Sequence, residues 1–149
     1  MTCIGRHLTI DMYGCNYDHL NNLEFIKTAM LTAIRETNLE VLDLVGHQTE
    51  PQGLTVIALL GQSHMSIHTF PEQRYVAVDI FTFGDYTRPD RALTVLKSFL
   101  KPDKTRTTNI MRGDFGLQKD MKPRIRVSIA PLRRVRNTSA RVWRFLRNK

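Results

Sequence analysis

The segment LTVIALLGQSHMSIHTFPEQRYVAVDIFTFG, residues 54–84, decides the fold class. Three apolar or alternating runs within it are each typical of a β-strand, namely residues 54–60, 63–70 and 75–83. Only Gly61 and Gln62 separate the first two runs, and Pro71 stops the second. Strands joined by such short connections must pair antiparallel, so the segment predicts three neighbouring strands of one antiparallel sheet.

Helical and strand patterns flank this segment on both sides. Apolar residues recur at three- and four-residue steps in two stretches, which predicts helices at residues 20–38 and 88–100. Three further runs predict strands at residues 5–14, 39–48 and 105–112. The resulting order, β-α-β-β-β-β-α-β, predicts an α+β two-layer sandwich with an antiparallel sheet and two helices on one face.

Charge divides the 149-residue chain into two parts. Residues 117–149 hold 11 of the 22 lysines and arginines and a single acid, Asp120, for a net charge of +10, whereas residues 1–116 sum to −2. We therefore expect one domain over residues 1–116, followed by a basic tail over residues 117–149. Basic and apolar residues alternate in the tail, which favours contact with an acidic partner, nucleic acid or an anionic membrane, or else a solvated tail.

Several protein classes are disfavoured by what the sequence lacks. No run approaches the roughly 18 consecutive apolar residues of a transmembrane helix, and the first ten residues contain no secretory signal pattern. Cys3 and Cys15 fit neither a disulfide scaffold nor a metal-ligand spacing. These features predict a cytoplasmic protein without a metal site.

The segment SHMSIHTFPE, residues 63–72, combines a serine and two histidines with the pattern of a buried strand. AVDIFTFGD follows at residues 77–85, and GRHLTIDMYGC opens the chain at residues 5–15. Together these segments resemble the prokaryotic S-adenosylmethionine decarboxylase family, and the resemblance extends over about residues 4–112. It implies a decarboxylase of polyamine synthesis, whose product donates the aminopropyl group of spermidine.

The resemblance also implies that the chain cleaves itself between Gln62 and Ser63. The products would be a β chain of residues 1–62 and an α chain that begins at residue 63, with Ser63 converted to a pyruvoyl group. Such a carbonyl forms a Schiff base with the substrate amine and withdraws electrons from the bond that loses carbon dioxide.

Family roles pass to individual residues of this chain by the same resemblance. His68 matches the base that removes the α-proton of Ser63, and Thr55 stands where relatives have a cooperating serine hydroxyl. Three positions match substrate-binding residues: Glu72 for ribose hydroxyls, Phe70 for adenine, and Asp11 at an acidic family position.

The spacing of Ser63 and His68 predicts a homodimer. Five residues of a strand span about 16 Å, and odd and even positions face opposite sides of a sheet. His68 of a regular strand therefore cannot reach Ser63 of the same chain, so we expect it to serve Ser63 of a partner subunit.

Three departures from the family pattern leave the substrate open. Thr49 lies near where relatives often carry a second aromatic residue for the adenine. Gln62 replaces a glutamate, and Phe83 replaces the cysteine that returns a proton to the substrate after carbon dioxide leaves. Tyr13, His7 and Cys15 are candidate replacement donors, and the sequence does not rank them. The alternatives are therefore a decarboxylase of arginine or ornithine, or a catalytically impaired regulatory paralogue.

Overall fold

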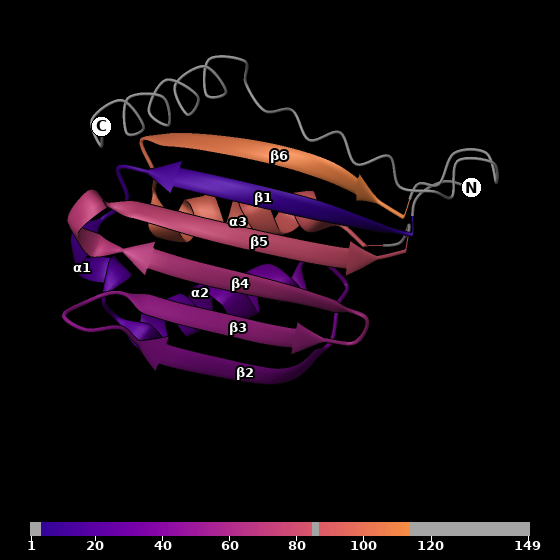
Figure 1. Cartoon of the computed structure of the whole chain (residues 1–149), viewed down its shortest axis with the longest axis horizontal. Helices are drawn as coiled ribbons and strands as arrows, with labels where there is room; N and C mark the ends of the chain where they lie inside the picture. Colours follow the sequence, from indigo (N-terminus) through magenta and orange to yellow (C-terminus); the bar gives the residue numbers. More distant parts are fainter. Residues whose placement is uncertain (1–3, 85–86, 114–149) are drawn as a thin grey trace, which may run out of the picture. The chain divides into compact units, whose positions relative to one another are not determined.

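A computed structural model describes residues 4–84 and 87–113, and the predicted basic tail at residues 117–149 lies outside this part. Six strands form a single sheet, which Figure 1 shows face-on with the helices behind it. The strands are β1 (Gly5–Tyr13), β2 (Val41–Gln48), β3 (Leu54–Leu60), β4 (Ser63–Phe70), β5 (Tyr75–Phe83) and β6 (Lys104–Arg112). Their order across the sheet is β2-β3-β4-β5-β1-β6, and every neighbouring pair is antiparallel. The predicted fold class is confirmed.

The helices differ from the prediction at one point. They are α1 (Tyr17–Leu20), α2 (Leu23–Arg35) and α3 (Pro89–Leu100), with a 3₁₀ turn, η1, at Pro71–Gln73. The single helix predicted over residues 20–38 is wrong at its start, because Asn21 and Asn22 are not helical and separate α1 from α2. The Asn22 side chain accepts a hydrogen bond from the Phe25 N–H at 3.0 Å, which caps a separate helix.

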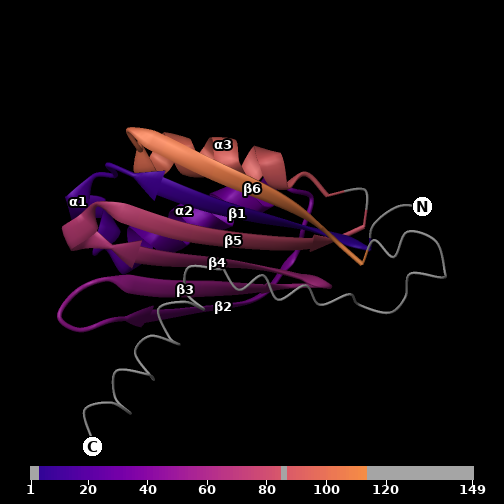
Figure 2. The same cartoon turned by 45° about the horizontal axis from the view of Figure 1, so that its top comes forward.

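One face of the sheet forms the core with α2 and α3. Figure 2 shows both helices on the same side of the sheet. The strands alternate accordingly, so that every second side chain of β4 and β5, and of β1 from Leu8 onward, is buried. Buried side chains of these strands meet those of the helices, including Ile10, Met65, Ile80, Met30 and Leu96.

The opposite face, called here the outer face, has no helix over it within the described residues. It carries His64, Ser66, His68 and Phe70 of β4 and their cross-strand neighbours. Several of its apolar side chains are exposed, among them Val45, Ile57, Leu59, Phe70 and Phe83. An exposed apolar surface of this kind is typical of a face that binds another protein.

None of the described helices has the length and apolar character needed to cross a membrane.

Candidate active site

A two-residue turn positions Ser63 at the start of β4. Leu60 and Ser63 are cross-strand partners, so Gly61 and Gln62 alone connect β3 to β4. Gln62 is exposed, whereas Ser63 is only 6% exposed. The predicted cleavage bond therefore lies where the chain passes from solvent into the sheet.

The Ser63 hydroxyl is held by the backbone of the neighbouring strand. Its Oγ accepts a hydrogen bond from the Phe83 N–H at 3.1 Å, at the last residue of β5. The Phe83 side chain is exposed. The residue at the family's cysteine position thus contacts Ser63 through its main chain.

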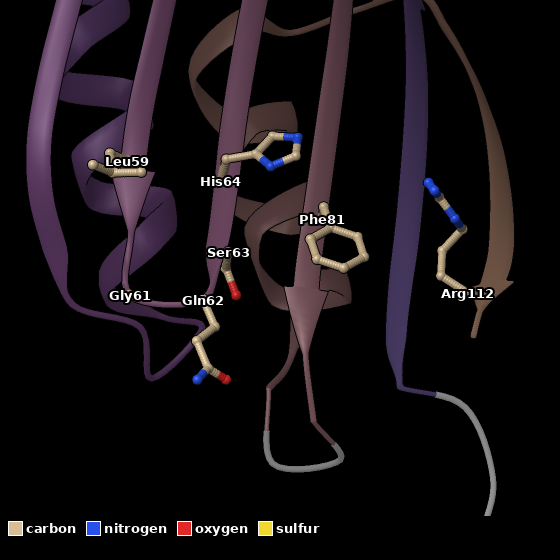
Figure 3. A pocket seen from close by; sticks show the side chains of 7 residues that line it. All are labelled: Leu59, Gly61, Gln62, Ser63, His64, Phe81 and Arg112. Carbon is tan, nitrogen blue, oxygen red and sulfur yellow. The ribbon is translucent and has the colours of Figure 1, made fainter. Parts of the chain in front are cut away.

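A pocket of about 400 Å³ opens beside Ser63 on the outer face. Figure 3 shows its lining residues: Leu59, Gly61, Gln62, Ser63, His64, Phe81 and Arg112. The His64 ring stacks on Phe81 with centroids 5.7 Å apart, and the Arg112 guanidinium lies 5.9 Å from the centre of the same ring. This lining contains one cation and no acid, so the pocket favours a ligand that carries a carboxylate.

His7 lies next to this pocket, and its two ring nitrogens face side chains of opposite charge. Its Nδ1 is 3.2 Å from the Arg112 guanidinium, and its Nε2 is 3.4 Å from Asp79 Oδ1. An arginine can only donate, so Nδ1 accepts and the ring hydrogen of the neutral form sits on Nε2, facing Asp79. The arrangement orients a histidine N–H beside the pocket.

His68 and Thr55 meet farther along the outer face. They are cross-strand partners on β4 and β3, and His68 Nδ1 lies 3.0 Å from Thr55 Oγ1. His68 is half-buried, whereas Ser63 has the opposite parity on the strand and is buried toward the helix side. The structure therefore brings Thr55 to His68 but keeps both away from Ser63 of the same chain.

An aromatic cluster forms around Phe70 at the far end of β4. Phe70 stacks on Tyr75 with centroids 5.6 Å apart, and Tyr13 lies 5.2 Å from Tyr75 on the other side. The Tyr75 hydroxyl donates a hydrogen bond to Asp11. Burial and this bond to Asp11 raise the pKa of Tyr75 to about 12. Sequence reasoning missed Tyr75, whose contacts depend on β1 lying next to β5.

Glu72 lies in η1, two residues after Phe70, and is exposed. Gln52 donates a hydrogen bond to Glu72 Oε1 at 2.9 Å, and Tyr17 donates to Gln52 Oε1 at 2.7 Å. This chain of side chains orients the carboxylate near Phe70. Predicted substrate residues Phe70, Glu72 and Asp11 therefore gather at one end of β4, opposite Ser63.

The three candidate proton donors lie at different ends of the sheet. His7 and His64 both have Phe81 as cross-strand partner, which puts His7 at the Ser63 end. Tyr13 pairs with Tyr75 and lies at the Phe70 end. Cys15 follows Tyr13 and is wholly buried, and this burial raises its pKa to about 11. Only His7 is near Ser63 of its own chain.

Among the described residues, no group of three or more His, Cys, Asp or Glu side chains is arranged to hold a metal ion.

Comparisons with known proteins agree on one family. The sequence profile of S-adenosylmethionine decarboxylase matches residues 6–113. S-adenosylmethionine decarboxylase proenzymes from Brevibacillus brevis and Methanococcus maripaludis are 42% and 34% identical to the chain, which they match over 73% and 76% of its length and over 82% and 93% of their own. The crystal structure of the Aquifex aeolicus adenosylmethionine decarboxylase superposes with a TM-score of 0.71 at 31% identity, covering 76% of this chain and 93% of that one.

A more distant structure shares the fold. The Trypanosoma brucei AdoMetDC-delta26 monomer matches 68% of this chain and 44% of its own length, with a TM-score of 0.52 and 17% identity.

Proposed function

Because the chain belongs to the S-adenosylmethionine decarboxylase family, we propose that it cleaves itself at Ser63 and then decarboxylates S-adenosylmethionine. One observation supports the proposal above all others. Ser63 follows an exposed two-residue turn, its hydroxyl accepts a hydrogen bond from the Phe83 N–H, and the residue lines a pocket of about 400 Å³. A nucleophile, an accessible peptide bond and space for a substrate thus occur together.

Self-cleavage proceeds in three steps with no added reagent but water. Ser63 Oγ attacks the Gln62 carbonyl carbon, and the peptide nitrogen leaves, which gives an ester and a free amine. A base then removes the Ser63 α-proton, the Cβ–Oγ bond breaks, and Gln62 departs as a carboxylate. Hydrolysis of the remaining unsaturated amine releases ammonia and leaves a pyruvoyl group.

His68 is the proposed base for the second step. Its Nε2 can accept the proton only if Nδ1 carries the ring hydrogen and donates it to Thr55 Oγ1. The Thr55 hydroxyl is placed to accept this hydrogen and so to orient the ring for the step.

The pocket suits the pyruvoyl group, which would draw electrons from the scissile bond of the bound amino acid. Leu59 and Phe81 give the site apolar walls, and Arg112 supplies a positive charge for the substrate carboxylate. His7, whose ring lies between Arg112 and Asp79 beside the pocket, is the candidate that replaces the absent cysteine as proton donor.

The other end of β4 suits the adenosine half of the substrate. Phe70 offers an exposed ring supported by Tyr75, and Glu72 offers a carboxylate for ribose hydroxyls. An adenine needs such an aromatic surface, whereas arginine and ornithine do not. These residues therefore favour S-adenosylmethionine over the two smaller amino acids.

Both halves of the site come together in a homodimer. Ser63 and Phe70 lie at opposite ends of β4, about 23 Å apart along a regular strand. A two-fold axis that crosses the strands, with the two outer faces in contact, brings the Ser63 end of β4 in one subunit over the His68 and Phe70 end of β4 in the other. The exposed apolar side chains of the outer face favour this contact with a second copy.

The test begins with freshly purified full-length protein. Cleavage of the 17.2 kDa chain after 62 of its 149 residues gives pieces of about 7 and about 10 kDa, and the larger carries a pyruvoyl group that borohydride reduces. A Ser63→Ala chain stays whole. A wild-type chain that also stays whole under every condition overturns the proposal and leaves the regulatory paralogue.

Release of carbon dioxide from S-adenosylmethionine, arginine and ornithine then identifies the substrate. We expect release from S-adenosylmethionine alone, and a KM for it about 5-fold to about 150-fold higher in Phe70→Ala, since a stacked base contributes about 1–3 kcal/mol. Equal release from arginine contradicts the assignment. The cytoplasmic location and the partner of the basic tail stay predictions.

A further inference from the structure

A buried hydroxyl without a partner lies at the end of β5. Thr82 is 0% exposed, and its Oγ1 makes no hydrogen bond within the described part of the chain. Burying an unpaired hydroxyl destabilises a folded protein, so such groups are rare and call for an explanation.

The strand register puts this hydroxyl beside Ser63. His64 and Phe81 are cross-strand partners, and the same antiparallel register sets Ser63 opposite Thr82. Both side chains are buried on the helix side of the sheet. Directly opposed residues of antiparallel strands have Cβ atoms about 4.5–5.5 Å apart, so the free hydroxyl of Thr82 is a neighbour of the reactive hydroxyl.

A second donor reaches Ser63 from the next residue. At the end of β5, the backbone hydrogen bond toward β1 is made by Gly84, whose N–H donates to the Ile4 carbonyl at 3.1 Å. The Phe83 N–H therefore points toward β4, where it donates to Ser63 Oγ at 3.1 Å. Thr82 and Phe83 thus offer two hydrogen-bond donors on the side of Ser63 that faces β5.

We propose that the Thr82 hydroxyl and the Phe83 N–H bind the oxygen that Ser63 gives up during self-cleavage. This inference rests on the proposed function. In the ester, Ser63 Oγ bridges its own Cβ and the Gln62 carbonyl carbon. When the α-proton is removed, its electron pair forms the Cα–Cβ double bond, and the Cβ–Oγ bond breaks. Its electrons stay on Oγ, which becomes an oxygen of the Gln62 carboxylate.

The two donors stabilise the negative charge that develops on this oxygen. Thr82 then gains the hydrogen-bond partner that it lacks in the uncleaved chain. Because Phe83 acts through its main chain, the donor is present whichever side chain occupies this position. The replacement of the family's cysteine therefore leaves this part of the processing machinery in place.

Thr82→Val tests the inference in the full-length chain, because it removes the hydroxyl and keeps the branched shape. Loss of one such donor slows a reaction by about 100-fold or more, so we expect slow release of the α chain and accumulation of the ester. Hydroxylamine cleaves that ester and leaves an α chain that begins with serine, which mass spectrometry separates from the pyruvoyl form. Thr82→Ser restores the hydroxyl and normal cleavage.

Thr105→Val is the matched control. Thr105 carries the other partnerless buried threonine hydroxyl within the described residues, but it pairs with Met12 at the far end of β1. Both valine variants should melt at or above the wild-type temperature, because each loses an unpaired buried hydroxyl. Only Thr82→Val should slow cleavage. Thr82→Ala removes the same hydroxyl and carries the test if valine does not fit.

Two outcomes overturn the inference alone: wild-type cleavage with equal rates in Thr82→Val, or slow cleavage in that variant without a hydroxylamine-sensitive ester. A wild-type chain that never cleaves overturns the proposed function as well.

Discussion

The two ends of β4 carry different chemistry on one continuous strand. At the Ser63 end are the hydroxyl, the exposed turn and a pocket with a cation and no acid. At the Phe70 end are stacked aromatic rings, Glu72 and the hydrogen bond between Thr55 and His68. In the proposed function, the first end has the bond that breaks, and the second has His68, the proposed base. Each end then supplies what the other lacks.

Mixed dimers give the largest expected effect and test this complementarity directly. Ser63→Ala and His68→Ala chains should each stay uncleaved by themselves. When they are co-expressed, heterodimers contain one intact site, in which Ser63 of the His68→Ala chain meets His68 of its partner. Random pairing makes half the dimers mixed, so about a quarter of all chains should be cleaved.

Mass spectrometry of the co-expressed chains identifies which one is cut. Cleavage of the His68→Ala chain supports the division between subunits. If no heterodimer is ever cleaved, the site is not shared, and the comparison between the two ends loses its functional meaning.

The hydrogen bond between His68 and Thr55 predicts a smaller effect. Thr55→Val removes the partner of His68 Nδ1 and leaves the ring free to rotate. A hydrogen bond contributes about 0.5–1.5 kcal/mol, which corresponds to cleavage up to about tenfold slower. Time courses on denaturing gels measure this rate, and Thr55→Ser should restore it. An unchanged rate in Thr55→Val would show that His68 needs no orienting partner.

Tyr75 provides the smallest effect, visible in the pH dependence of stability. Its pKa is raised from 10.0 to about 12, so above pH 10 the unfolded chain loses this proton while the folded chain keeps it. The free energy of unfolding therefore falls between pH 10 and pH 12. The stabilising contribution of Tyr75 is present in full below pH 10. Tyr75→Phe should show a shallower fall in urea titrations at pH 9 and pH 11.5. An equal fall of the free energy of unfolding in Tyr75→Phe and the wild type would mean that burial and Asp11 do not raise the pKa of Tyr75.

Most strands of the fold were predictable because turn residues in the sequence mark their ends. The expected limits of β4 and β5 match the structure, since a tight turn, Pro71 and Gly84 interrupt the alternating pattern on either side. The break before α2 was not predictable from periodicity, because Leu20 and Leu23 continue the apolar spacing across Asn21 and Asn22. Only the capping hydrogen bond of Asn22 reveals the new helix.

The site was predictable in part for a similar reason. Ser63 and His68 lie within one motif, so sequence spacing alone gave their separation along the strand. Tyr75 and Thr82 were missed because their partners depend on strand order. β1 lies next to β5, which joins residues as far apart as Asp11 and Tyr75. From the sequence alone, Thr82 looks like an ordinary residue on the buried face of an apolar strand.

The opposite placement of Ser63 and His68 on one strand has a consequence for maturation kinetics. If each chain is cut with the help of another, the rate of activation depends on how often two copies meet. In that case, dilute and newly translated protein stays uncleaved, and activation follows second-order kinetics until dimers are saturated. Abundance of the precursor then acts as the trigger for its own conversion.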